Sequence, residues 1–255
     1  MDQDARLKNW KYEEGQPFTG WDFSYLDGRM LEEQPVWSYS ARAAELMRQS
    51  SSALDLDTGG GERFLELREH WPPKVVVTEH YLPNFKLATE RLTPFGATVV
   101  DIQMSDFGLM PFADGEFDLV LNRHAAFNPY EVARILAPGG TFLTQQVHGL
   151  SAADLLAAFD AKPQWPEATP EKYLPRLQEA GLEITNVENW SGKLTFTDVG
   201  AIVYYLRAIP WLVPGFSVES YLNYLLTLQE QLERDRVLAF TSRKYLIEAR
   251  KPAAH

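Results

Sequence analysis

Cysteine is absent from the 255 residues of the sequence. This excludes disulfide bonds, thiolate metal ligands and a cysteine nucleophile. No uninterrupted apolar run of about 18 residues occurs, so no membrane-spanning helix is expected. Two of the first four residues, Asp2 and Asp4, are acidic, whereas a secretory signal would begin with basic and then apolar residues. We therefore expect a cytoplasmic protein that does not associate with a membrane.

Positive charge is scarce: 24 lysines and arginines stand against 35 aspartates and glutamates, which gives a net charge of -11. Proteins that bind nucleic acids usually neutralise phosphates with a basic surface, so a nucleic-acid partner is disfavoured. Only residues 231–255 are locally basic, which leaves room for a small basic patch. A small molecule is therefore the favoured substrate.

Histidine is also infrequent, and the five histidines lie at positions 70, 80, 124, 148 and 255. None is three to five residues from another, which is the spacing of many zinc ligands, so no metal site is predicted. The sequence lacks a Gly-x-Ser-x-Gly motif as well. A hydrolase of the α/β type would therefore lack its nucleophile.

Short apolar segments alternate with helical ones from residue 53 onward. Runs of β-branched residues, such as 75–77, are typical of strands buried on both faces. Strands are expected at residues 53–56, 74–78, 97–102, 117–121, 141–147, 182–187 and 237–249. This alternation predicts an α/β fold with a doubly wound, mostly parallel sheet of seven strands.

The chain is expected to divide into four parts. These are an aromatic-rich N-terminal arm at 1–48, the α/β core at 49–188, a helical insertion at 189–236, and the last core strand at 237–255. Long arms and insertions often carry function, so the arm is interpreted as a lid and the insertion as a substrate cover. The alternative is that the arm is irregular and that the aromatic residues of both segments simply pack in a core.

A glycine-rich turn follows the first core strand, where residues 57–61 read Asp-Thr-Gly-Gly-Gly. Such a turn between a strand and a helix lets the backbone approach a ligand, although a tight turn without a ligand is the alternative. A nicotinamide-binding motif would need another glycine where Phe64 stands, which disfavours a dehydrogenase. Glu79 ends the second strand, where a carboxylate can accept hydrogen bonds from both hydroxyls of a ribose.

Further motifs follow in order along the chain. Residues 55–61 and Glu79 are followed by Asp106-Phe107, by the run at 109–120, and by the helix and turn at 131–140. In this order and spacing the sequence resembles the class I S-adenosylmethionine-dependent methyltransferases, with a domain like their type 11. The resemblance covers about residues 50–150 and, more loosely, the later strands. It implies their Rossmann-like fold and S-adenosylmethionine as the cofactor.

The resemblance also implies roles for individual residues. The glycines would line the methionine end of the cofactor, Glu79 would bind its ribose, Asp106 its adenine amino group with Phe107 beside it, and Asn122 the region near the sulfonium. The full set of expected cofactor-binding residues is Asp55, Asp57, Thr58, Gly59, Gly60, Gly61, Glu79, His80, Asp106, Phe107, Asn122 and Arg123.

Asp57 departs from the family motif, which has its first glycine at this position. Aspartate tolerates left-handed backbone geometry better than most residues, so the turn can be retained. Its side chain would either crowd the cofactor and repel the methionine carboxylate, or attract the ammonium group.

The expected activity is methyl transfer to a small organic molecule, by in-line displacement at the methyl group. Positioning supplies most of the catalysis in such a reaction, and a base is needed only if the acceptor begins protonated. His124, just past the fourth strand, is the candidate base, and a structural histidine is the alternative. A cofactor-binding sensor without catalysis and an RNA methyltransferase are the rival functions. No oligomeric state is predicted.

Overall fold

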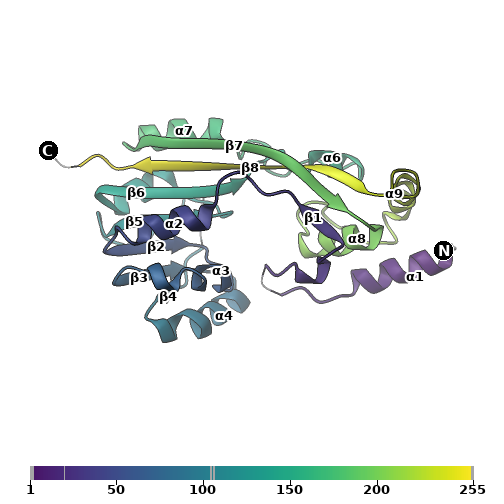
Figure 1. The fold of residues 1–255 in the computed structure, drawn as a ribbon, viewed down its shortest axis with the longest axis horizontal. Helices are drawn as coiled ribbons and strands as arrows, with labels where there is room; N and C mark the ends of the chain where they lie inside the picture. Colours follow the sequence, from purple (N-terminus) through teal and green to yellow (C-terminus); the bar gives the residue numbers. More distant parts are fainter. Residues whose placement is uncertain (1–2, 20, 104, 106, 254–255) are drawn as a thin grey trace. The chain divides into compact units, whose positions relative to one another are not determined.

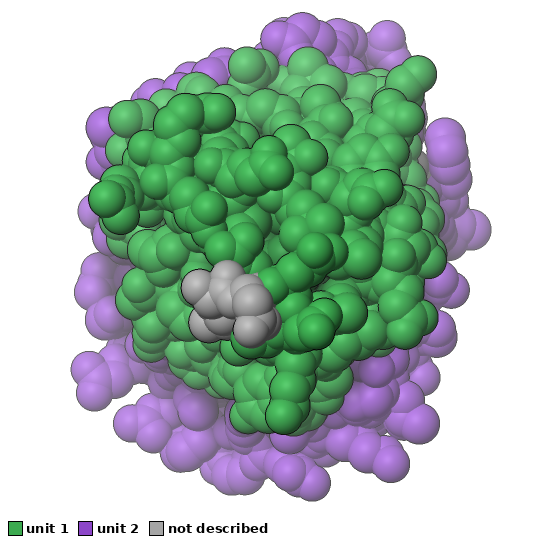
Figure 2. All heavy atoms as spheres, turned by 90° about the vertical axis from the view of Figure 1, so that its right-hand side faces the viewer, with its two compact units in different colours: residues 1–35, 148–167, 190–243 green, residues 36–147, 168–189, 244–255 purple. Residues whose placement is uncertain are grey.

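The computed structural model describes residues 3–19, 21–103, 105 and 107–253 (Figure 1). The chain forms two compact units, which are coloured separately in Figure 2. Unit 1 comprises residues 1–35, 148–167 and 190–243, and unit 2 comprises residues 36–147, 168–189 and 244–255. The expected division into arm, core, insertion and last strand stays a prediction. Within the described part of the chain, no helix has both the length and the apolar character needed to cross a bilayer.

The strands form one sheet in the order β1-β7-β8-β6-β5-β2-β3-β4. Its parallel part pairs β4 with β3, β3 with β2, β2 with β5, and β5 with β6, while β8 runs antiparallel to β6. The parallel strands are β2 (Ser52–Leu56), β3 (Lys74–Thr78), β4 (Thr98–Val100), β5 (Phe117–Arg123) and β6 (Leu136–Val147). The doubly wound, mostly parallel sheet expected from the sequence is thereby confirmed.

Unit 2 contains this parallel sheet with an apolar cluster on each face. Successive strand residues alternate between the clusters, since Ala53 and Leu119 belong to one and Leu54 and Val120 to the other. Ser38 caps the start of the helix at Tyr39–Met47, and Asn128 caps the start of the helix at Pro129–Ile135. Each side chain accepts a hydrogen bond from a backbone N–H. The helices are α2 (Tyr39–Met47), α3 (Glu62–Leu65), α4 (Leu82–Leu92), α5 (Pro129–Ile135) and α7 (Pro170–Glu179), with short 3-10 turns η2 (Arg68–His70) and η3 (Thr93–Phe95).

Unit 1 gathers three separate stretches of chain around one aromatic-rich core. Tyr204 and Phe216, two of the aromatic residues of the expected insertion, are buried in that core. Its elements are α1 (Gln3–Glu14), η1 (Ser24–Leu26), β1 (Met30–Glu32), α6 (Ala153–Ala157), α8 (Val199–Ala208) and α9 (Leu222–Asp235). Strands β7 (Glu183–Phe196) and β8 (Leu238–Arg250) each have one part in unit 1 and the other in unit 2.

The strand count expected from the sequence is wrong, because the sheet has eight strands and not seven. The additional strand, β1, is only three residues long and pairs antiparallel with the end of β7. Three residues are too few to show an alternating pattern, so only a pairing partner distant in sequence reveals the strand. The expected strand at 182–187 likewise extends to Phe196, and the helical part of the insertion begins only at Val199.

The first residues show no helical periodicity, yet Gln3–Glu14 forms a helix. Only Trp10 and Glu13 are buried along it, so its amphipathic pattern is too weak to detect. Contacts with distant residues stabilise it instead, because Arg29 donates to the Glu13 carboxylate and the Tyr204 hydroxyl donates to the carbonyl of Pro17 just beyond its end. Tertiary packing therefore decides this helix.

Candidate active site

The carboxyl ends of the parallel strands carry nearly all of the expected site residues. The chain runs from β2 outward through β3 and β4, and then returns to the other side of β2 as β5. In such sheets ligands bind where the strand order reverses, which here is at the ends of β2 and β5. The register places Leu56 beside Asn122, and Asn122 beside Thr144 of β6. The residues that follow these positions therefore share one edge.

The glycine-rich turn follows β2 in the conformation that its glycines permit. Gly59 and Gly61 have positive φ angles of 67° and 81°. A Cβ atom on Gly60 would lie 2.6 Å from Glu62 Oε2, and one on Gly61 would lie 2.9 Å from Leu92 Cδ1. Arg91 holds the turn by donating to the Gly60 carbonyl over 2.8 Å. A side chain at Gly61 would therefore disturb this bend, whereas at Gly60 the ends of the Glu62 and Arg91 side chains would have to move.

Asp57 occupies the left-handed conformation that glycine has in the family motif, with a φ of 60°. Its backbone N–H donates to the hydroxyl of Thr78 over 2.9 Å, and the N–H of Thr58 donates to the Thr78 carbonyl over 2.8 Å. These two bonds tie the turn to the end of β3. The turn is thus retained with aspartate in place of glycine, as the tolerance of aspartate for this geometry predicts.

Three carboxyl groups near the turn have raised pKa values. Burial, together with the neighbouring Asp57 carboxylate, raises the pKa of Asp55 to about 7. Burial and the nearby Glu79 raise the pKa of Asp57 to about 6. Burial raises the pKa of Glu79 as well, and its Oε1 accepts the backbone N–H groups of His80 and Tyr81 over 2.8 and 2.7 Å. An acidic environment of this kind suits a cationic ligand.

Asn122 at the end of β5 belongs to a buried polar network. Its Oδ1 accepts from the Thr144 hydroxyl over 2.8 Å and also from Gln146 Nε2. Its own amide nitrogen Nδ2 is buried and has no partner among the described residues. A buried donor without a partner costs free energy unless a ligand uses it, so Asn122 is a candidate ligand contact.

His124 follows β5 with a positive φ of 62°, an unusual conformation for a residue with a side chain. Strained residues of this kind cluster at functional sites. Its Nε2 lies 3.1 Å from Nε2 of Gln145, and Oε1 of Gln145 accepts from the indole N–H of Trp37 over 2.8 Å. Sequence reasoning missed Trp37, Gln145 and Gln146. Two adjacent glutamines in the buried second half of a strand were the available signal.

The remaining expected residues differ in their burial and in their contacts. The guanidinium carbon of Arg123 lies 5.8 Å from the centre of the Tyr39 ring, and its buried Nε has no partner among the described residues. His80 contacts Asp101 through Nδ1 at 2.7 Å. Phe107 is 82% exposed and lies 5.4 Å from the guanidinium carbon of Arg176. Asp106 lies outside the described residues.

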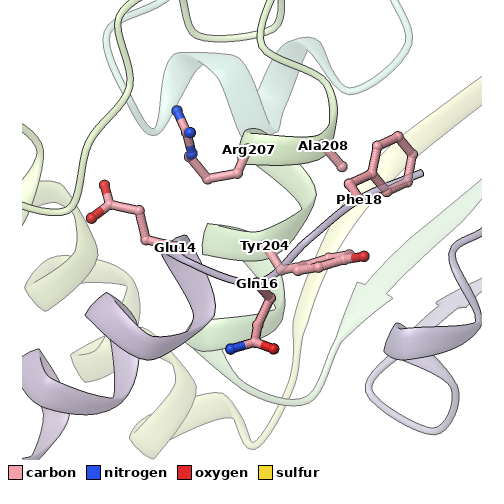
Figure 3. Close-up of a pocket in the computed structure, with 6 residues that line it drawn as sticks. All are labelled: Glu14, Gln16, Phe18, Tyr204, Arg207 and Ala208. Carbon is pink, nitrogen blue, oxygen red and sulfur yellow. The ribbon is translucent and has the colours of Figure 1, made fainter. Parts of the chain in front are cut away.

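Unit 1 has a hollow of its own, between the end of α1 and helix α8 (Figure 3). Glu14, Gln16 and Phe18 line it from the N-terminal side, and Tyr204, Arg207 and Ala208 line it from α8. None of the motifs found in the sequence contributes to it.

Comparisons with known proteins agree with the motifs. A family model for a methyltransferase domain matches residues 54–144. A protein from Bacillus halodurans C-125, classed as a candidate methyltransferase, superposes with a TM-score of 0.59 at 20% identity, covering 84% of this chain and 97% of that one. An S-adenosylmethionine-dependent methyltransferase from Mesorhizobium loti gives a TM-score of 0.51 at 18% identity, covering 82% and 95%. A search of curated proteins found no match.

A third structure is the phosphoethanolamine N-methyltransferase 2 of Haemonchus contortus, in complex with phosphomonomethylethanolamine and S-adenosylhomocysteine. It gives a TM-score of 0.52 at 14% identity, and the match covers 98% of this chain and 58% of that one. At these identities the structures show a shared fold, and the family model adds that residues 54–144 match a methyltransferase domain. S-adenosylmethionine is the cofactor that the resemblance of the motifs implies.

The carboxyl edge fits this cofactor. Leu92 leaves no room for a side chain at Gly61, the Glu79 carboxylate lies one strand away, and Asn122 Nδ2 is a buried donor without a partner among the described residues. S-adenosylmethionine offers a methyl group on a positively charged sulfur, which the carboxyl groups nearby favour electrostatically.

Proposed function

We propose that the protein methylates a small organic molecule at the carboxyl edge of its parallel sheet. The observation that carries this proposal is the conjunction of the glycine bend, Glu79 and Asn122 on three adjoining strands. The net charge of -11 supports a small substrate over a nucleic acid.

The residues at this edge have distinct proposed roles. The backbone at residues 59–61 lies along the methionine end of the cofactor, and Glu79 accepts hydrogen bonds from the ribose. Asp57 attracts the ammonium group, because its carboxylate is half-buried and next to the glycine bend. Arg123, one residue beyond Asn122, attracts negative charge on the acceptor.

Calorimetry with S-adenosylmethionine tests the cofactor site. Glu79→Gln keeps an oxygen for the N–H groups of His80 and Tyr81 but removes the charge, so affinity should fall by about 1–3 kcal/mol. Glu90→Gln, an exposed residue of α4, is the matched control and should bind as the wild type does. An unchanged affinity in Glu79→Gln would mean that the ribose site lies elsewhere.

Turnover distinguishes the rival functions. Incubation with S-adenosylmethionine and a pool of metabolites should produce S-adenosylhomocysteine. Tight binding of the cofactor without turnover across a broad pool would favour the non-catalytic sensor. Affinity for RNA that falls steeply with salt would favour an RNA methyltransferase.

A further inference from the structure

Three side chains from separate segments form a hydrogen-bonded series next to the expected active site. Trp37 lies just before α2, Gln145 lies near the end of β6, and His124 follows β5. Trp37 Nε1 is 2.8 Å from Gln145 Oε1, and Gln145 Nε2 is 3.1 Å from His124 Nε2. Gln145 is only 5% exposed, so its amide depends on these partners for its hydrogen bonds.

The chemistry of the three groups fixes the direction of both hydrogen bonds. An indole nitrogen can only donate, so the amide atom that faces Trp37 must be the oxygen of Gln145. The amide atom that faces His124 is then the nitrogen, which also can only donate. His124 Nε2 must therefore present a lone pair, and a neutral imidazole with a lone pair on Nε2 carries its proton on Nδ1.

We propose that Trp37 and Gln145 are positioning residues that hold His124 in its neutral Nδ1–H tautomer, so that His124 donates a hydrogen bond to the methyl acceptor instead of removing a proton from it. This assignment differs from the general base expected from the sequence. The acceptor atom would then be an ionised oxygen, because it has one lone pair for the hydrogen bond and another for the methyl group, whereas an unprotonated amine has only one. As the new oxygen–carbon bond forms, the methyl–sulfur bond would break and its electron pair would stay on the sulfur. The tautomer of His124 is argued from geometry alone, whereas the hydrogen bond from His124 to a methyl acceptor rests on the proposed function.

The surroundings of His124 are consistent with this role. Nδ1 of His124 has no hydrogen-bond partner among the described residues. Desolvation by the surrounding protein lowers the pKa of His124, and the positive charges of Arg123 and Lys244 lower it further. The same two cations would attract an acceptor with a negatively charged oxygen.

Nitrogen NMR of the full-length protein labelled with ¹⁵N-histidine tests the proposal directly. The two ring nitrogens of a neutral histidine give different signals according to which one carries the proton, and His124→Asn identifies the signals of His124. At neutral pH the Nδ1–H tautomer should exceed the Nε2–H tautomer by roughly tenfold, the ratio that one net hydrogen bond supports. A predominant Nε2–H tautomer or an imidazolium would overturn the proposal.

Two variants test the positioning residues. Gln145→Glu is isosteric but its carboxylate accepts from both neighbours, so His124 should move its proton to Nε2 and its pKa should rise. Trp37→Phe removes the indole donor, which frees the amide to turn, and a mixture of both tautomers should result. Gln178→Glu on the exposed side of α7 adds the same charge away from the site and should leave the spectrum unchanged.

The spectrum is measured without cofactor or substrate, so its outcome is independent of the proposed function. Failure to bind S-adenosylmethionine would contradict the cofactor site and leave the tautomer assignment standing. If the ring-nitrogen signals of His124 are the same in folded Gln145→Glu as in the wild type, the positioning role is overturned, even if methylation is observed.

Discussion

The two units of this protein are built in different ways. Unit 2 comprises three stretches, but one of them, residues 36–147, supplies all of its parallel strands. Unit 1 is assembled from three separate stretches, and its contacts join residues far apart in the chain. The guanidinium of Arg29 shows this best, because it binds Glu13 over 2.9 Å and Asp198 over 2.7 Å.

This difference predicts a division of roles, in which unit 2 carries the proposed cofactor site and unit 1 does not contribute to it. In unit 2 the motif residues follow the ends of strands, where regular hydrogen bonding sets their positions to within one residue. In unit 1 aromatic rings and ion pairs determine the arrangement, as in the tilted contact between Tyr25 and Tyr204, whose ring centres are 4.5 Å apart. Mutations should therefore separate stability from cofactor binding.

Phe196→Ala should have the largest effect. Phe196 is fully buried in the unit 1 core, and removing its ring should lower the free energy of unfolding by about 3–5 kcal/mol. Because Phe196 contributes nothing to the carboxyl-edge site, affinity for S-adenosylmethionine should change by less than about twofold at a temperature where the variant is folded. Urea denaturation and calorimetry measure the two quantities. A large loss of affinity for S-adenosylmethionine in the folded variant would contradict the view that the unit 1 core affects stability and not cofactor binding.

Asp55→Asn should change how stability depends on pH. The pKa of Asp55 is about 7 in the folded protein, well above its ordinary value of 3.8. As pH rises between these values, the unfolded chain loses this proton first, so the wild type loses stability that the variant keeps. The variant should gain about 2–3 kcal/mol relative to the wild type between about pH 5 and pH 8. Parallel denaturation curves at both pH values would contradict the raised pKa.

Arg29→Met tests the ion pairs of unit 1. The substitution leaves Glu13, which is 5% exposed, without its cationic partner, so stability should fall by about 1–3 kcal/mol. The estimate is modest because the Arg29 side chain is partly exposed and solvent screens the pair. Thermal denaturation is the measurement, and wild-type stability would mean that apolar packing alone holds α1.

Ser38→Ala should have the smallest effect of the four. The Ser38 hydroxyl accepts the N–H of Ala41 over 3.2 Å at the start of α2, and such a cap is worth about 1 kcal/mol. Ser38 also follows Trp37, so the His124 spectrum should be recorded for this variant. A normal spectrum with lower stability would show that the cap stabilises the helix without setting the tautomer.

Much of unit 2 could be predicted because its information is local. The β-branched run of β3 and the glycine turn after β2 each depend on neighbouring residues, and the carboxyl ends of parallel strands meet by geometry. The helix α1 and the strand β1 could not be predicted, because their stabilising partners are far away in sequence. The role of Gln145 could not be predicted for the same reason, since its partner Trp37 is 108 positions away in the sequence.

The alternating α/β core, the glycine bend and the acidic residue after the next strand can be recognised from the order of residues, because they follow from backbone conformation and the spacing of apolar residues. The proposed position of the proton on His124 could be inferred only from the folded chain, since it depends on a tryptophan and a glutamine that are far apart in sequence. The same holds for Asp55, whose proton affinity depends on burial that no local pattern reveals.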